Sequence, residues 1–125
     1  LALLPNAYMS GFAAGVNMAG GNAENSGAIP MNSIGLMGLH IITAGNCRDG
    51  TETVISQDGY KKFVVKNGKL NGFILVGCVD RAGIYTRLVR EKIPLCGLDF
   101  EKLKNFPTLA AFPDEEREKI LEGVI

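Results

Sequence analysis

Residues 60–79, YKKFVVKNGKLNGFILVGCV, decide the fold, because two strand-like runs flank the dipeptide Asn67-Gly68. Asn-Gly is typical of a tight β-hairpin, since both of its residues tolerate a positive φ. The first run, Tyr60–Lys66, carries three lysines and is expected near a sheet edge or with one wet face. The second run, Leu70–Val79, is apolar on both faces and is expected at the sheet centre.

The chain that follows this hairpin is expected to be helical. Asp80 is a suitable N-cap for a helix over Ala82–Lys92, and Asp99 for a short helical turn through Leu103. A last helix is expected over residues 113–122, with acidic residues at its positive end. The apolar face of the first of these helices comprises Ile84, Tyr85, Leu88 and Val89.

The chain that precedes the hairpin is mostly apolar. Ser33–Ala44 is expected to form one strand covered on both faces, and Thr53–Ser56 a short strand. Leu4–Ala19 is expected to form a helix with Pro5 in its first turn and Gly20-Gly21 after its end. The sequence therefore predicts an α+β fold: an antiparallel sheet of three to four strands, two to three helices packed on it, and one extra N-terminal helix.

Charge is distributed very unevenly along the chain. The 125 residues contain 13 basic and 13 acidic side chains, and this zero net charge argues against a nucleic-acid binder. Glu24 is the only charged side chain before Arg48. Residues 1–21 contain neither the unbroken apolar run of a membrane span nor the basic start of a signal peptide. We therefore expect the first 47 residues to be covered by further protein, in a fragment of a longer chain.

Few residues are candidates for chemistry. His40 stands alone in an apolar strand and is expected to be structural, with no cluster around it that could bind a metal. Cys47, Cys78 and Cys96 match no zinc or redox spacing and are expected to be buried thiols in a reducing compartment. The hairpin lysines are expected to form a solvated face. No catalytic residue and no metal site are predicted.

The first helix has two notable features. Ala7, Gly11, Gly15 and Ala19 recur every four residues and form a stripe along which another backbone could approach closely. Its N-terminus, Leu4–Ala7, presents backbone N–H groups and the positive end of the helix dipole, which favour an anionic or electron-rich ligand atom. Every helix has such an end, so this signal alone is weak.

The same residues carry a resemblance. Leu3–Ala7 followed by Gly11–Gly20 resembles the P-N-A…G…A…N-M-A-G segment of FAD-dependent pyridine nucleotide-disulfide oxidoreductases. Ile29–Ser33 and Gly38–Gly45 are similar to the start of the C-terminal domain in the subgroup of NADH–rubredoxin reductase, NADH oxidase and the nitrite reductase large subunit. Gly77–Tyr85 fits that domain's passage from strand to helix. The family's G-x-G-x-x-G fingerprints and acidic FAD-binding motif are absent from these residues.

The resemblance implies two domains and a function for the intact enzyme. Residues 1–21 would be the last helix of an FAD-binding domain, and residues 22–125 a C-terminal α+β interface domain that packs near the flavin and serves dimerisation. FAD and NAD(P)H would be the cofactors of the intact cytoplasmic oxidoreductase, and none would bind to this fragment, which would be inactive alone. The residues implied to face the flavin are Leu4, Pro5, Asn6 and Ala7.

The partners implied are the FAD and NAD(P)H domains of the same polypeptide and a second copy in a homo-oligomer. Neither nucleic acid nor a membrane is expected as a partner. The alternative is a free-standing small α+β binding or assembly module that covers its apolar helix by self-association. A native product of this length, with its own start codon, would favour that alternative.

Overall fold

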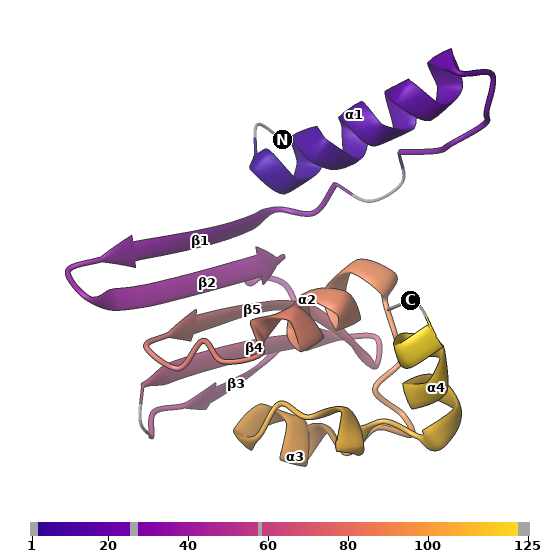
Figure 1. The fold of residues 1–125 in the computed structure, drawn as a ribbon. Helices are drawn as coiled ribbons and strands as arrows, with labels where there is room; N and C mark the ends of the chain where they lie inside the picture. The colour runs from indigo at the N-terminus through magenta and orange to yellow at the C-terminus, as the bar shows by residue number, and fades with distance from the viewer. Residues whose placement is uncertain (1–2, 26–27, 58, 123–125) are drawn as a thin grey trace.

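The computed structural model describes residues 3–25, 28–57 and 59–122, which form an α+β fold around one antiparallel sheet (Figure 1). Within this part of the chain the sheet has five strands in the order β1-β2-β5-β4-β3. The strands are β1 (Met31–Leu36), β2 (Leu39–Gly45), β3 (Thr51–Ile55), β4 (Tyr60–Lys66) and β5 (Lys69–Val76). The helices are α1 (Leu4–Met18), α2 (Ala82–Glu91), α3 (Phe100–Asn105) and α4 (Asp114–Glu122), with a 3-10 turn at Leu109–Ala111.

The hairpin of β4 and β5 forms as its sequence predicts. Asn67 and Gly68 both have positive φ, 51° and 69°, which the tight turn requires. Phe63 of β4 lies opposite Phe73 of β5, and both rings are fully buried. β5 lies in the middle of the sheet between β2 and β4, so its expected central position is confirmed.

The expectation for Ser33–Ala44 is wrong, because this segment forms a second hairpin rather than one doubly covered strand. The chain reverses at Met37 and Gly38, whose φ angles are 51° and 79°, so Leu36 pairs with Leu39. This is the same left-handed turn as at Asn67-Gly68, but with Met in the place of Asn. Since methionine is not a usual turn residue, composition did not mark the turn, and the sheet has more strands than expected.

The helix α2 provides the main cover of the sheet. Tyr85 packs between two buried rings, with centroid distances of 5.0 Å to Phe63 and 5.5 Å to Phe73. The Tyr85 hydroxyl donates a 2.5 Å hydrogen bond to the Leu103 carbonyl in α3, and burial raises the pKa of this phenol. Leu88 of α2 is also fully buried. One aromatic residue of α2 therefore joins the central hairpin to α3.

The two predicted helix caps have different outcomes. Asp99 caps α3, and its carboxylate accepts a 3.0 Å hydrogen bond from the Lys102 backbone N–H. Asp80 does not cap α2, because Arg81 occupies the N-cap position in a left-handed conformation (φ 54°) and no side chain caps the helix. Asp80 therefore lies one residue before the N-cap position.

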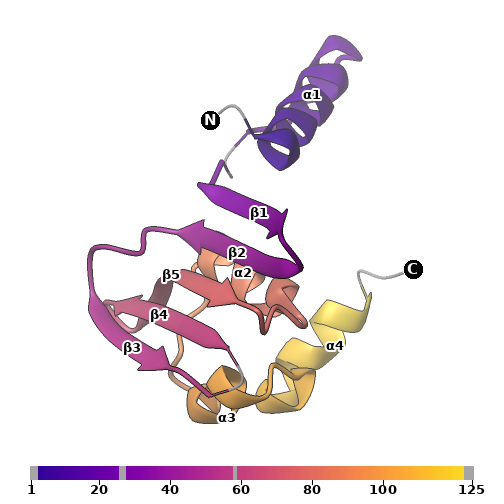
Figure 2. The ribbon, with the colours of Figure 1, turned by 90° about the vertical axis from the view of Figure 1, so that its left-hand side faces the viewer.

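The helix α1 lies apart from the remainder of the fold. In Figure 2 the five strands run side by side, and α1 extends beyond β1, away from the helices α3 and α4. The hydrophobic core consists of residues from the sheet and from the segments after β5, together with Ile29. The core therefore forms without α1.

Replacing Phe63 with Ala tests the role of this aromatic packing. The side chain is fully buried and contacts the rings of Tyr85 and Phe100, at centroid distances of 5.0 and 5.9 Å. We expect Phe63→Ala to lower the free energy of unfolding by about 3–5 kcal/mol, measured by urea denaturation. The matched control is Phe106→Ala, because Phe106 is exposed and should change stability by less than about 0.5 kcal/mol. Equal losses in both variants would contradict this account of the core.

Candidate functional site

The N-terminus of α1 is the candidate site that the sequence marks. Leu3 occupies the N-cap position without a side-chain cap, and the first turn holds no acidic side chain. Leu4, Pro5 and Ala7 are exposed, Leu4 to 88% of its surface. The positive end of the helix dipole is therefore accessible and is not neutralised by a neighbouring carboxylate.

Asn6, the fourth residue expected at this site, points toward its own chain instead. Its side chain is only 3% exposed, and its Nδ2 donates a 3.2 Å hydrogen bond to the Ile29 carbonyl. Its Oδ1 is buried without a hydrogen-bond partner among the described residues. Asn6 therefore ties the start of α1 to the segment before β1, and its position there was not anticipated from the sequence.

Both stripes of α1 face solvent in this chain. Ala7, Gly11, Gly15 and Ala19 are all exposed, and a Cβ atom added at Gly11 or Gly15 would meet no atom within 4 Å. The bulky side chains Leu4, Tyr8 and Phe12 are exposed as well. The close backbone contact for which the small residues are suited has no partner in the described part of the chain.

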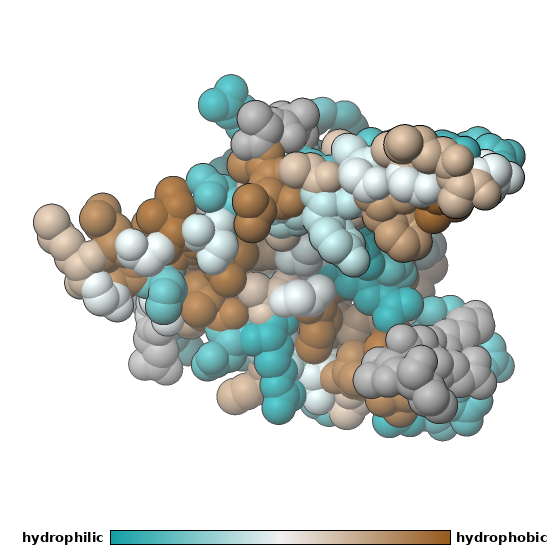
Figure 3. Space-filling view, turned by 45° about the horizontal axis from the view of Figure 1, so that its top comes forward, coloured by the Kyte–Doolittle hydropathy of each residue, from teal (hydrophilic) through white to brown (hydrophobic). Residues whose placement is uncertain are grey.

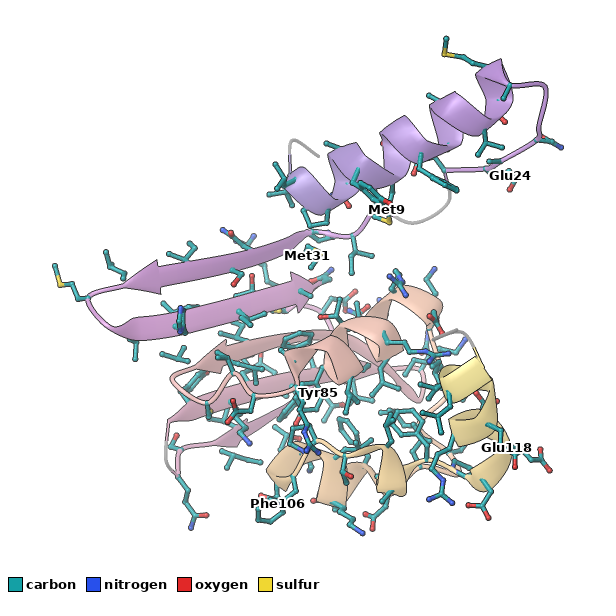
Figure 4. The ribbon with its side chains drawn as sticks, viewed as in Figure 1. Met9, Glu24, Met31, Tyr85, Phe106 and Glu118 are labelled. Atoms are coloured by element: carbon teal, nitrogen blue, oxygen red, sulfur yellow. The ribbon has the colours of Figure 1, made fainter. Side chains whose placement is uncertain are left out.

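An apolar cleft separates α1 from the sheet and α2. Its volume is about 730 Å³, and Tyr8 and Met9 of α1 line one side of it. Met31 at the start of β1 and Arg90 of α2 line the other side. Figure 4 shows Met9 below α1 and Met31 across the gap from it. The helix therefore leaves part of its inner face uncovered too.

The face of the sheet opposite α2 is also apolar. The buried side chains of Ala44, Phe73 and Leu75 lie on the covered face, so their neighbours along the strands point the other way. Figure 3 shows hydrophobic residues gathered over the β1–β2 hairpin. We name this surface the open-face patch, and it consists of Ile34, Leu36, Leu39, Ile41, Ile74 and Val76.

The open-face patch has no covering element among the described residues, and Leu36 in it is 60% exposed. The sequence signals this surface through its missing charges: β1 and β2 contain no ionised side chain to mark a wet face. The expectation that these strands are covered on both faces is therefore not met by the residues that the structure describes. A covering partner would have to be apolar and shaped to a twisted sheet.

The cysteines and His40 do not form a reactive cluster. Cys47 follows β2, its Sγ donates to the Phe73 carbonyl at 3.3 Å, and burial raises the pKa of its thiol. Cys78 is half-buried, but Cys96 is exposed, so the expectation of three buried thiols is wrong for Cys96. Cys96 lies in the irregular segment between α2 and α3, where no strand or helix covers it. His40 is exposed on β2, opposite Gly35.

Neither a metal site nor a membrane-spanning helix occurs in the part of the chain that the structure describes. No group of three or more histidine, cysteine or acidic side chains there is placed to bind a metal ion. No helix among those residues is long and apolar enough to cross a bilayer.

No protein-family model and no curated protein sequence matches this chain. The functional reading of the site therefore depends on its geometry and on the motif resemblance alone.

Replacing Asn6 with Ala tests its role in holding α1. We expect the loss of the bond to Ile29 to cost about 0.5–1.5 kcal/mol locally, because the amide is buried and no other side chain takes its place. Amide hydrogen exchange in α1 should accelerate while exchange in β5 stays unchanged. The control is Asn25→Ala, which removes only an exposed bond to the Ser10 hydroxyl. Acceleration of exchange in β5 would show instead that α1 supports the core.

The raised pKa of Cys47 predicts a pH profile. Only the thiolate is alkylated, so the rate at Cys47 should continue to rise at pH values where the same thiol in urea-denatured chain, with a pKa of about 8.5, has levelled off. The measurement is site-resolved mass spectrometry after timed iodoacetamide labelling. If burial only limited the access of iodoacetamide to Cys47, the labelling rate would be lower at every pH, but the midpoint of its pH profile would not move. An equal midpoint in folded and denatured chain would contradict the desolvation of Cys47.

Proposed function

We propose that this chain is the C-terminal interface domain of a cytoplasmic FAD- and NAD(P)H-dependent oxidoreductase, preceded by the last helix of its FAD-binding domain. The observation that carries the proposal is the exposure of α1, whose small-residue and bulky stripes have no partner among the described residues. The domain boundary at residue 21 is supported by the core, which forms without α1. In this role α1 is covered by the remainder of the FAD domain.

The N-terminus of α1 has the chemistry that a flavin ring needs at its electron-rich edge. In the intact enzyme, bound FAD would accept a hydride from NAD(P)H. Leu4, Pro5 and Ala7 are exposed around an uncapped helix end without a carboxylate, so the dipole can stabilise negative charge on a ligand placed there. Asn6 holds this end of the helix in place through Ile29 rather than contacting the ligand.

The open-face patch supports the second half of the proposal, the role as an interface. Its six residues are apolar and lie on one face of the strands β1, β2 and β5. In the proposed enzyme this face packs against the FAD and NAD(P)H domains or a second copy. By itself the chain contributes binding surface and no catalytic group.

The native length of the polypeptide tests the proposal directly. Mass spectrometry of tryptic peptides from the source cells should find sequence upstream of residue 1 that contains two glycine-rich nucleotide-binding folds. A native product that begins near residue 1 would overturn the proposal and favour the self-associating module.

Self-association of the chain alone tests the interface. We expect it to form oligomers in sedimentation-velocity experiments, because α1 and the open-face patch both expose large apolar side chains. Leu36→Lys should shift the distribution toward monomer, since it places a charge in the patch. The control is Leu121→Lys, at an exposed leucine of α4 outside both surfaces. A monomer at all concentrations would count against an apolar interface.

Substitution of Gly11 separates the role of α1 in the chain from its role in the enzyme. In the chain alone, Gly11→Leu should be neutral or stabilise α1 by about 0.8 kcal/mol, because Leu is the better helix former and nothing lies within 4 Å. In the intact enzyme the same change should lower FAD content, since the bulk falls on the closely packed stripe. Gly11→Ala, which stays small, is the matched control. Unchanged FAD content in the intact Gly11→Leu enzyme would refute the packing of this stripe.

A further inference from the structure

A second cleft lies on the side of the molecule away from α1. Its volume is about 560 Å³, and it opens where β3 ends and β4 begins, beneath the junction of β5 and α2. The end of α3 and the loop after it, together residues 105–108, close the other side. Figures 1 and 2 show α3 and α1 at opposite ends of the fold, so this cleft is separate from the apolar cleft beside α1.

Lys61 of β4 brings the first positive charge into this cleft. Its Nζ donates hydrogen bonds of 3.2 and 3.3 Å to the carbonyls of Lys104 and Asn105, the last residues of α3. These carbonyls hold the ammonium in position, but they carry no full charge. Lys61 takes part in no ion pair among the described residues. Its ammonium group has three N–H donors, and the two bonds to the carbonyls leave the third one over.

Arg81, which precedes α2, brings the second positive charge into the cleft. Its Nη1 donates a 3.3 Å hydrogen bond to the Pro107 carbonyl, and its other guanidinium N–H groups form no bond among the described side chains. Arg81 likewise takes no part in an ion pair in the described ranges. Asp80 also lines the cleft, so two cations stand against one carboxylate, and the cleft carries a net positive charge.

The remaining wall of the cleft combines polar residues, Gln57, Asn105 and Thr108, with an apolar part. In the apolar part Phe106 is 74% exposed, and Ile55 and Tyr85 line the same space. Figure 4 shows Phe106 at the outer end of α3 and Tyr85 between α2 and the sheet. A ligand with one charged end and one apolar end would match both parts of this lining.

We propose that this cleft binds a small oxyanion, a carboxylate or phosphate joined to an apolar group, between Lys61 and Arg81 with the apolar part on Phe106 and Ile55. The anion accepts hydrogen bonds from the free N–H groups of both cations, and the fork of Arg81 suits two oxygens of one group. The main-chain bonds to Lys104 and Pro107 hold both cations in place before the ligand arrives. This proposal does not depend on the flavin-related function.

Cys78 provides a reporter for the test, because its thiol lines the cleft while Cys96 lies outside it. The whole chain is labelled with N-ethylmaleimide, an uncharged reagent, and the rate at each cysteine is followed by mass spectrometry. The probes are benzoate, phenyl phosphate and the uncharged benzyl alcohol, at constant ionic strength. We expect the anionic probes to slow labelling of Cys78, benzyl alcohol to have little effect, and labelling of Cys96 to stay unchanged. The stronger of the two anionic probes identifies the preferred anion.

Two variants assign the effect to the two cations. Lys61→Gln and Arg81→Gln should each raise the benzoate concentration needed for half protection of Cys78 by at least about threefold, since each removes one partner of the anion. Lys69→Gln, at an exposed lysine that begins β5, is the matched control and should leave the concentration unchanged. Circular dichroism checks that each variant is folded. If Lys61→Gln loosens α3, the test depends on Arg81→Gln, which removes no bond to α3.

Three results would overturn the proposal. Benzyl alcohol could protect Cys78 as well as benzoate does, which would show an apolar cleft without anion recognition. Folded Lys61→Gln and Arg81→Gln could bind benzoate like the parent chain. The third result is that neither anionic probe protects Cys78 at any concentration that the chain tolerates.

Discussion

The packing of Tyr85 between Phe63 and Phe73 determines where the remaining elements lie. This contact fixes α2 on the central hairpin, and the hydroxyl of the same residue holds α3 through the Leu103 carbonyl. With α3 in place, its last carbonyls meet Lys61 on β4, so a second bond joins sheet and helix at the far end. The positive cleft is thus a by-product of the way in which one aromatic side chain locates two helices.

Two kinds of surface follow from this arrangement. The covered face of the sheet and its helices form a self-sufficient core, and charged residues surround it after residue 47. The helix α1 and the open-face patch are instead uncharged and uncovered. Since burying such surface is favourable and exposing it is costly, both surfaces are suited to contact with further protein.

The sequence predicts most of the fold but only part of the site. Periodicity and turn chemistry gave β4, β5, α1 and the Asp99 cap, because these elements follow from residues close together in the chain. The Met37-Gly38 turn was missed since a methionine adopts a positive φ there without a compositional signal. The tether of Asn6 to Ile29 and the cleft of Lys61 and Arg81 join residues from distant segments, so no local pattern could reveal them.

The strand order also determines when the sheet can close during synthesis. β2 pairs with β5, and the whole of β3 and β4 lies between them in the chain. Each other pair of neighbouring strands is consecutive, so hairpins and a meander can form locally while the β2–β5 pairing must bridge a long loop. On a ribosome, the uncharged β1–β2 hairpin emerges well before its partner strand. It therefore spends that interval as an unprotected apolar segment, the state in which nascent chains are most prone to aggregate or to need a chaperone.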